Sequence, residues 1–591
     1  MRDFLKNLLA TFIGCMAALA LCSLFVLGIM GAFLALGSSD TAVVVPHQAI
    51  LKIDLSQPVN ERGNDDPFSD ISSLSLSFNP AEKSLGILSA VQAIERAAFD
   101  PAIRFIYMNL SSINIGMSQL EELRDAVEKF RKSGKPVLAY ATNYSQGAYY
   151  MATAADKIYM QKEGNAMIFG LGTNIMFFKE LLNRLGIDVQ LIRHGKFKAA
   201  AEQFVADNIS EENRTQNQEL LDSIWQTWVQ AISARREISE ETFNSLVDNL
   251  KLKDAESLVE YNIIDEAVTM QQMTEKLCSL FGVEKDDDLK MISLAAYAKA
   301  TESQNLKATD KIAVIFADGE IAMSGKEGIT ASEFCPMISK IKGDSSIKAV
   351  VLRVNSPGGD AQAAEMINSE LQMLRAHKPV VVSFGDYAAS GGYWISAQSD
   401  QIFTNRTTLT GSIGVFSLMM NYGKGLKKHL DINVAQLGTN RHSNMLSGIN
   451  PLNKEEQAYM QDFVEDVYTD FISIVSQGRN LTPGYVDEVA QGRVWSGKDA
   501  VELNLADKVG GISEAIQYAA AYSGCDNYKI VEYPAVKTSV EKLMDMLNET
   551  NAASSALGEP LKSLGKIYGE LTGEKGMKSY ARIPYIYEFN Y

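Results

Sequence analysis

The chain alternates predominantly apolar runs with stretches in which apolar residues recur every three or four positions. In the first half, Ile103 to Leu110 and Lys135 to Ala139 are apolar runs, and Met117 to Phe130 between them has the three-and-four spacing. Short apolar runs are typical of buried strands, and this spacing is typical of helices. A strand, a helix and a second strand in this order predict parallel strands joined by a right-handed crossover. The pattern therefore predicts an α/β fold.

The same succession returns in the second half of the chain. Ile347 to Val354 and Lys378 to Val382 are apolar runs, and Ala361 to Leu374 between them has the helical spacing. Ile103 to Tyr159 can be aligned with Ile347 to Phe403, with a small shift in the middle. Each half also begins with a strand-like run and closes with a long amphipathic helix: Ala49 to Leu55 and Asn217 to Arg236 in the first, Lys311 to Phe316 and Lys454 to Ile474 in the second. Gene duplication followed by divergence explains this repeat, which predicts two tandem α/β domains.

The repeat and the chain length set the expected domain organisation. With 591 residues the chain is too long for a single core. We expect an N-terminal domain over residues 47–295 and a C-terminal domain over residues 305–535, with the connection between them near 290–310. Residues 1–40 would hold the cytoplasmic N-terminus and a membrane anchor. Residues 536–591 would form a C-terminal tail with an aromatic end, for which edge packing against a domain or a neighbouring subunit is the default interpretation.

The N-terminal segment is apolar enough to cross a membrane. Leu8 to Gly37 contains no charged residue, and about 20 helical residues suffice to span a bilayer. Arg2 and Lys6 precede this segment and Asp40 is the first charge after it, so the positive-inside tendency places the N-terminus in the cytoplasm. The alternatives are a cleaved signal peptide, whose apolar region is usually shorter, and lipoprotein cleavage before Cys22, where the preceding residue is a poor match. We expect an uncleaved, single-pass anchor with the bulk of the chain outside the cytoplasm.

Composition and the absence of certain motifs argue against several classes of function. The formal net charge is −17 at pH 7, and no dense basic patch is visible, so we expect no binding to nucleic acid. The 5 cysteines are widely spaced and form no CxxC or Cys/His ligand pattern. Neither HExxH nor GxxxxGK[ST] occurs. We therefore expect no metal site, no disulfide framework and no cofactor.

Two motifs of the second half are missing from the first. Ser390 lies in Ala-Ser-Gly-Gly-Tyr-Trp, after a predicted strand and before a helix-like run, where the first half has Gln146. Asn-Ser-Pro-Gly-Gly at 355–359 also follows a strand, and its adjacent glycines can present N–H groups to a developing oxyanion. The aligned residues 111–115 contain no glycine. A helix cap would explain the serine alone, and a turn would explain the glycines alone. Their joint loss indicates that they act together.

A serine hydroxyl needs a base to become a good nucleophile. None of the 5 histidines lies in a recognisable triad context. A lysine can serve when burial keeps it neutral, and Lys198, preceded by Phe197 and followed by three alanines, has an apolar setting. Lys196 is the competing candidate, and the residues alone leave this choice open, because most lysines are solvated surface charges. The rough counterpart at 438–442 has no lysine, which indicates one active site divided between the two halves.

Taken together, these motifs resemble those of the bacterial signal peptide peptidase A family, also called protease IV, in its long, duplicated form (serine peptidase family S49). The resemblance rests on Ser-Pro-Gly-Gly at 356–359, Ala-Ala-Ser-Gly-Gly-Tyr-Trp at 388–394 and Leu-Thr-Gly-Ser-Ile-Gly at 409–414. It covers essentially the whole chain after the apolar N-terminal segment. It implies two tandem Clp-protease/crotonase-like domains, the first supplying a lysine and the second a serine.

The resemblance also implies a role for each candidate residue. Ser390 corresponds to the family's nucleophile. Lys198, rather than Lys196, corresponds to the general base, because the family's lysine stands in a Gly-x-aromatic-Lys-(Ser/Ala)-Ala segment. Gly359 would donate an N–H group to the oxyanion hole, and Ser412 would orient the lysine.

The implied protein is a membrane-anchored serine endopeptidase with a Ser/Lys dyad that degrades cleaved signal peptides and other short apolar peptides. Its expected location is the bacterial inner membrane, with the bulk of the chain on the periplasmic side and lipid contact through the N-terminal helix. The expected assembly is a homotetramer. There are two alternative hypotheses. The first is an inactive membrane-associated scaffold, since the first half has already lost its serine, and the intact motifs of the second half weigh against it. The second is a crotonase-type acyl-CoA enzyme, which would need neither Ser390 nor Lys198, so the presence of both residues weighs against it.

Overall fold

The computed structural model describes most of the chain between the N-terminal segment and the C-terminal tail. The described residues are Gly14, 43–64, 84–302, 308–325, 327–535 and 580–582. The expected anchor, apart from Gly14, and most of the expected tail therefore lie outside them. No helix within the described residues is long and apolar enough to cross a membrane.

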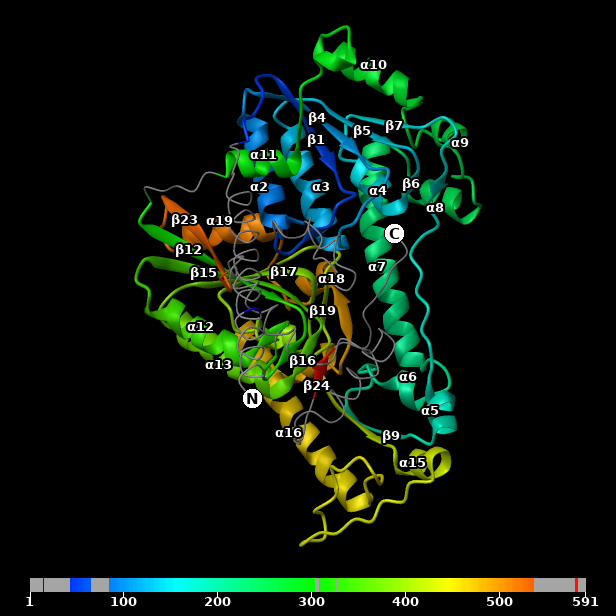
Figure 1. Ribbon diagram of the computed structural model, residues 1–591, viewed down its shortest axis with the longest axis vertical. Helices are drawn as coiled ribbons and strands as arrows, with labels where there is room; N and C mark the ends of the chain where they lie inside the picture. Colours follow the sequence, from blue (N-terminus) through cyan, green and yellow to red (C-terminus); the bar gives the residue numbers. More distant parts are fainter. Residues whose placement is uncertain are drawn as a thin grey trace, which may run out of the picture.

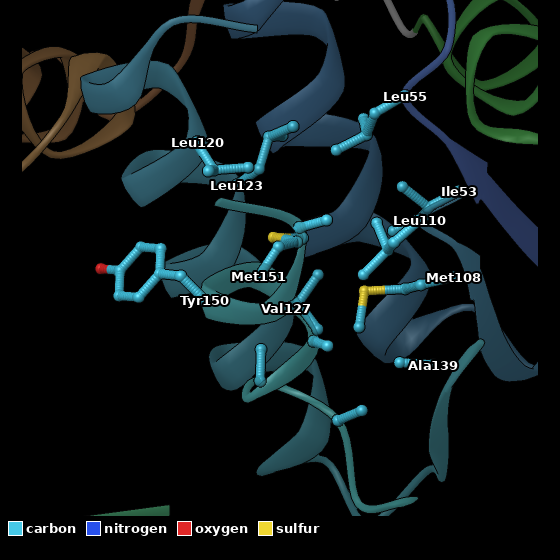
Figure 2. Packing of buried hydrophobic residues seen from close by; sticks show 14 of the residues in the cluster. Ile53, Leu55, Met108, Leu110, Leu120, Leu123, Val127, Ala139, Tyr150 and Met151 are labelled. Atoms are coloured by element: carbon cyan, nitrogen blue, oxygen red, sulfur yellow. The ribbon is translucent and has the colours of Figure 1, made fainter. Parts of the chain in front are cut away.

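The first lobe is built on a six-stranded parallel sheet. The strand order is β10-β7-β5-β4-β1-β11. One face is covered by helices from both ends of the lobe, and α10 (Met270–Phe281) covers the other. Figure 2 shows the first interface, where Leu120, Leu123 and Val127 face Met108 and Ala139 of the sheet. The strands are β1 (Ala49–Asp54), β4 (Ile103–Asn109), β5 (Val137–Ala141), β7 (Lys157–Met160), β10 (Glu266–Ala267) and β11 (Met291–Ser293); the helices of the first face are α2 (Ile87–Phe99), α3 (Met117–Arg131), α4 (Gln146–Ala152) and α7 (Glu211–Arg236).

The second lobe repeats this plan. Its main sheet has the order β21-β19-β17-β15-β12-β23, with β18 also paired to β17 and β22 paired to β18. All these pairings are parallel except that between β19 and β21. Helices α12, α13 and α16 cover one face, and α19 covers the other. The prediction of two tandem α/β domains is therefore confirmed. The elements are β12 (Asp310–Asp318), α12 (Ala331–Gly343), β15 (Ile347–Ser356), α13 (Ala361–Arg375), β17 (Val380–Ala389), β18 (Gln401–Thr404), β19 (Leu409–Gly411), α16 (Lys454–Arg479), β21 (Val494–Ser496), β22 (Lys508–Val509), α19 (Ile512–Tyr522) and β23 (Tyr528–Tyr533).

The long closing helix of each half begins at a side-chain cap. The hydroxyl of Ser210 accepts a hydrogen bond from the N–H of Asn213 at the start of α7. Asn453 and Glu456 form a capping box at the start of α16. Such caps satisfy backbone N–H groups that have no partner inside the helix. In Figure 1, α7 runs along one side of the molecule from the first lobe towards α6 (Glu202–Val205).

A third sheet joins segments from both halves and from the tail. Its order is β14-β13-β16-β24-β20-β9. The pairing of β9 with β20 is antiparallel and runs from His194 opposite Val415 to Asp188 opposite Asn421. Because β9 belongs to the first half and β20 to the second, this pairing places the loop after His194 beside the segment before Val415. The strands are β9 (Asp188–His194), β13 (Ile321–Ala322), β14 (Ile329–Thr330), β16 (Gly358–Asp360), β20 (Val415–Asn421) and β24 (Tyr580–Arg582).

The lobes also meet across a buried charged cluster. The Arg353 guanidinium lies 2.6 Å from a Glu61 carboxylate oxygen and 2.7 Å from one of Glu122. All three side chains are almost fully buried. The N–H of Ser118 donates a hydrogen bond of 2.7 Å to Asp386 nearby. Glu61, Glu122 and Ser118 belong to the first half, and Arg353 and Asp386 to the second, so the cluster fixes one lobe against the other.

Candidate active site

Ser390 stands at the junction between β17 and the short helix α14 (Gly391–Trp394). Its backbone has φ 55° and ψ −114°, a conformation that residues other than glycine rarely adopt. The N–H of Ser390 donates a hydrogen bond of 2.8 Å to the carbonyl of Gly411, which holds this turn. The hydroxyl makes no capping hydrogen bond to α14, and the side chain is fully buried. A helix cap therefore does not explain this serine.

Lys198 lies on the loop that follows β9, and its amine reaches Ser390 from the other half of the chain. Its Nζ atom is 2.7 Å from Oγ of Ser390. The same nitrogen lies 2.9 Å from the carbonyl oxygen and 3.0 Å from the hydroxyl oxygen of Ser412. The structure thus brings together the three side chains that the sequence singled out.

Burial favours the neutral form of this amine. Lys198 is fully buried, and burial lowers its pKa well below the ordinary value, because a charged ammonium group is poorly solvated there. Among the described residues, no carboxylate forms an ion pair with Lys198 that would reverse this shift. A neutral amine within hydrogen-bond distance of a hydroxyl can accept its proton.

The structure also separates the two candidate lysines. Lys196 is exposed, and its ammonium group lies 5.1 Å from the centre of the Phe197 ring. Ala199 and Ala200, which follow Lys198, are buried, as expected from the apolar sequence around this lysine. Lys198 is therefore the lysine of this site.

Glycines of the second lobe make room for Lys198. A methyl group on Gly492 would lie 2.6 Å from the Cα atom of Lys198, and Gly492 has φ 80°. A methyl group on Gly414 would lie 3.2 Å from Cδ of the same lysine. Gly414 ends the Leu-Thr-Gly-Ser-Ile-Gly motif, so the motif could have indicated it. Gly492 lies outside every motif, and only the folded structure shows that it packs against Lys198.

Gln216, which the sequence did not single out, ties the lysine loop to the second lobe. Its side-chain N–H group donates a hydrogen bond of 3.0 Å to the carbonyl of Phe197. Its side-chain oxygen accepts one of 3.3 Å from the N–H of Val494. The side chain is 2% exposed. One amide thus bridges the residue before Lys198 and strand β21.

Backbone N–H groups of Gly359 and Gly391 lie close together beside Ser390. A methyl group on Gly391 would lie 3.2 Å from the amide nitrogen of Gly359, and one on Gly358 would lie 2.8 Å from the amide nitrogen of Gly391. Gly358 has φ 101°, which favours glycine. Neighbouring backbone N–H groups beside a nucleophile are the donors from which an oxyanion-binding site is built.

The position in the first lobe that corresponds to Ser390 carries no nucleophile. The side-chain oxygen of Gln146 accepts hydrogen bonds from the N–H groups of Phe169, at 3.2 Å, and Gly170, at 3.1 Å. Its amide group donates one of 3.1 Å to the carbonyl of Gly170. Gln146 therefore holds a loop of its own lobe, and the hydroxyl of Ser145 caps α4.

None of the five histidines takes part in this geometry. All five histidines are described, and none of them hydrogen-bonds to Ser390. His194, although it precedes the lysine loop, stacks on Tyr468 with 3.7 Å between ring centres and lies 2.5 Å from a Glu465 carboxylate oxygen. The part of the chain that the structure describes contains no group of three or more His, Cys, Asp or Glu residues that could hold a metal ion.

Comparison with known proteins identifies the family. The family model described as peptidase family S49 matches residues 129–284 and 372–526, one segment in each lobe. The chain belongs to peptidase family S49. The first matched segment of this S49 chain contains Lys198, and the second contains Ser390 and Ser412. The resemblance to protease IV in its duplicated form is confirmed, and the protein is a serine peptidase.

Three relatives of this S49 peptidase cover most of its length. "Protease 4" of Haemophilus influenzae is 34% identical over 450 residues, which are 74% of this chain and 73% of that protein. "Protease 4" of Salmonella typhi is 32% identical over 492 residues, or 81% and 78%. "Serine protease SPPA, chloroplastic" of Arabidopsis thaliana is 30% identical over 499 residues, or 82% and 72%. The similarity therefore extends over both lobes.

Proposed function

We propose that this peptidase hydrolyses peptide bonds with Ser390 as the nucleophile and Lys198 as the general base. The observation that carries the proposal is the 2.7 Å distance between Nζ of Lys198 and Oγ of Ser390, in a fully buried setting. The two residues come from different lobes, so the site exists only when both lobes are folded against each other.

The reaction begins with the neutral amine of Lys198. It takes the proton of Ser390 as the hydroxyl oxygen attacks the peptide carbonyl. The N–H groups of Gly359 and Gly391 stabilise the oxyanion that forms. The ammonium of Lys198 then protonates the leaving amine, and a water molecule deprotonated by the same lysine releases the acyl group from Ser390. The carbonyl and hydroxyl oxygens of Ser412 hold the lysine nitrogen in place through these steps.

The proposed substrates are cleaved signal peptides and other short apolar peptides. The uncharged run from Leu8 to Gly37 supports this, because an anchored enzyme stays close to peptides left in a membrane after secretion. We infer a single-pass protein of the bacterial inner membrane with both lobes, each of the Clp-protease/crotonase type, on the periplasmic side.

Homotetramer assembly is part of the same proposal. Helices α5 (Lys179–Leu185) and α15 (Gly423–Leu430) and the paired strands β9 and β20 form an arm that draws on both halves of the chain. In Figure 1, α5, β9 and α15 lie together at the lower right. Leu181 and Leu430 on this arm are 51% and 63% exposed, and Leu437 just beyond it is 91% exposed. Exposed apolar side chains of this size support burial between subunits. Light scattering of the detergent-solubilised full chain should give the mass of four copies, and the mass of a single copy would contradict assembly.

Labelling with a fluorophosphonate, followed by peptide mapping, tests the catalytic assignment. The wild-type protein should be modified at Ser390, and Lys198→Ala should lose both labelling and peptide hydrolysis. Lys196→Ala is the matched control, because this exposed lysine lies on the same loop and should leave both unchanged. Ser390→Ala should remain folded and inactive. Near-normal hydrolysis by Ser390→Ala or Lys198→Ala would refute the assignment.

The second candidate is an inactive assembly scaffold. The observation that favours it is the first lobe, where Gln146 hydrogen-bonds to a neighbouring loop in the place of a nucleophile. The same labelling experiment decides between the two, because a scaffold would leave Ser390 unmodified.

A further inference from the structure

The strand that leads to the nucleophile, β17, is irregular in its pairing with β15. Val354 of β15 pairs with Phe384 of β17. Further on, Ser356 pairs with Ala388, so that two steps along β15 correspond to four along β17. Residues 385–387 of β17 therefore form a bulge. Bulges of this kind change the direction of a strand and often lie next to active sites.

In the first half, where residues 84–302 are described, the corresponding strand lacks this irregularity. Strands β4 and β5 pair in one continuous register. The sequence shows the same difference between the halves. Ser390 comes ten residues after Val380. Gln146 comes only nine residues after Val137, which follows the same Lys-Pro pair. The half that keeps the nucleophile therefore has an additional residue in the strand that leads to it.

The bulge is held from the first lobe, through helix α3. The carboxylate of Asp386 accepts a hydrogen bond of 2.7 Å from the N–H of Ser118, in the first turn of α3. Gly116, at the N-cap position of α3, has no side chain that could do this, and a methyl group there would collide with the Asp386 carboxylate. A carboxylate at a helix N-terminus satisfies a free N–H group and interacts favourably with the helix dipole. Asp386 thus caps a helix of the other lobe.

Two further contacts fix the backbone of the bulge. The hydroxyl of Thr408 donates a hydrogen bond of 2.8 Å to the carbonyl of Gly385, and its oxygen lies 3.3 Å from the hydroxyl oxygen of Ser118. The N–H of Tyr387 donates one of 3.1 Å to the side-chain oxygen of Asn355. Ser118 and Thr408 are fully buried. The bulge is therefore tied to α3, to the segment before β19 and to the end of β15.

The position of the nucleophile depends on this bulge. Beyond it, β17 runs beside β19 as far as Ala389 opposite Gly411. Ser390 and Ser412 follow directly at the ends of the two strands, and both contact Lys198. A strand rises about 3.3 Å per residue, which exceeds the 2.7 Å between the serine hydroxyl and the lysine amine. A slip of β17 by one residue would therefore take the hydroxyl out of reach of the amine.

We propose that Asp386 is a positioning residue for the nucleophile: it anchors the bulge of β17 to α3 and thereby places Ser390 within reach of Lys198. The first lobe then contributes the general base and also the support that sets the position of the nucleophile. The inference rests on the proposed function. It adds a second reason why the site forms only when the lobes are docked, and it assigns a role to a carboxylate outside the sequence motifs.

Removing the carboxylate tests this role. Asp386→Ala should lower kcat for a fluorogenic peptide and the rate of fluorophosphonate labelling by about ten-fold or more, with KM close to the wild-type value. Asp386→Asn keeps an oxygen that can accept the N–H of Ser118 and should recover most of the loss. Asp254→Ala is the matched control, because Asp254 caps α9 (Ala255–Glu260) within the first lobe by accepting the N–H of Ser257 at 2.9 Å. This control should leave both rates unchanged.

Thr408→Val gives an independent test that preserves the shape of a buried side chain. It removes the hydrogen bond to the carbonyl of Gly385 and should lower the same two rates at least a few-fold. Thr153→Val is its control, because the hydroxyl of Thr153 is equally buried and donates to the carbonyl of Tyr150 within the first lobe. If Asp386→Ala does not fold, the comparison of these two threonine variants decides alone.

All rates are measured per folded molecule, well below the melting temperature of every variant. A lower melting temperature of Asp386→Ala with unchanged kcat and labelling rate would assign Asp386 a purely structural role and overturn the inference. An Asp386→Asn enzyme as slow as Asp386→Ala would contradict the capping contact on which the inference depends. Both results leave the catalytic assignment intact, because Ser390 of the wild type is still labelled. Failure of Ser390 to react in the wild type would overturn the proposed function itself.

Discussion

Gly492 and Lys198 touch through their backbones across the two lobes: a methyl group on Gly492 would lie 2.6 Å from the Cα atom of Lys198. The N–H of Gly492 donates a hydrogen bond of 2.8 Å to the carbonyl of Ile413, the residue after Ser412. The contact therefore sets the distance between the lysine loop and the segment that holds the lysine nitrogen.

Gly492→Ala should lower kcat by about ten-fold or more, because a misplacement of about 1 Å in a reacting group can cost about 100-fold. The added methyl group must push Lys198 away, and Gly492 has φ 80°, which disfavours alanine. Gly484→Ala is the matched control, since nothing lies within 4 Å of a methyl group there. Steady-state kinetics with a fluorogenic peptide measures both variants. A Gly492→Ala enzyme as active as Gly484→Ala would contradict the packing argument.

The rate of peptide hydrolysis should rise with pH and then level off. Burial lowers the pKa of Lys198, and only the neutral amine can accept the proton of Ser390. The midpoint of the rise in kcat/KM should lie well below the ordinary lysine pKa of about 10.4. Measuring kcat/KM across the neutral and alkaline range gives this midpoint. A rate that is independent of pH over that range would exclude lysine as the base.

The stability of the folded protein should also depend on pH through Lys198. Between the lowered pKa of Lys198 and about 10.4, the unfolded chain binds one more proton at this residue than the folded chain does. Burial of Lys198 therefore costs stability at neutral pH, and the cost shrinks as pH rises towards the ordinary value. Relative to Lys198→Met, the wild-type melting temperature should increase from about pH 7 to about pH 9. The exposed residue Lys196 supplies the control, because Lys196→Met should show no such trend.

Much of the fold and the serine could be predicted from the sequence, because both leave local signals. The apolar run Ile347 to Val354 became most of β15, and the helical spacing of Ala361 to Leu374 became α13 (Ala361–Arg375). Ser390 was identified as a candidate nucleophile because the first half has Gln146 at the aligned position. These signals depend only on neighbours in the chain or on comparison of the two halves.

Other parts of the site depend on contacts that no local pattern records. The residues alone left the choice between Lys196 and Lys198 open, and only the family resemblance selected Lys198. The physical reason for the choice is the pairing of β9 with β20, which joins His194 to Val415 across the two halves. The tail strand was expected only as edge packing, since three residues carry no periodicity. Gln216 lies in a polar part of α7, and the sequence does not distinguish a buried glutamine there from an exposed one.

Gln216 should act as a positioning residue for Lys198. Gln216→Leu removes the bridge between the Phe197 carbonyl and the Val494 N–H, so the lysine loop loses one of its hydrogen-bonded links to the second lobe. The hydrogen bond from the N–H of Phe197 to the Gln491 carbonyl remains. We expect kcat to fall by about ten-fold or more with KM unchanged, and the midpoint of the pH–rate profile to move as the burial of Lys198 changes. Gln218→Leu, at an exposed position on the same helix, should do neither. A lower melting temperature with unchanged kcat and pH profile would assign Gln216 a purely structural role.

Arg353 should be essential for the docking of the lobes. Arg353→Met leaves the carboxylates of Glu61 and Glu122 buried without their cation, and breaking a buried pair in this way costs about 3–5 kcal/mol. Arg375→Met is the control, because its ion pair with Asp400 is partly exposed and worth about 0–1 kcal/mol. Because Lys198 and Ser390 come from different lobes, fluorophosphonate labelling of the Arg353→Met enzyme should fall at temperatures where each lobe still keeps its helical circular dichroism signal. Labelling and unfolding that follow the same curve would show that the lobes dock and fold as one unit, without a separate role for this cluster.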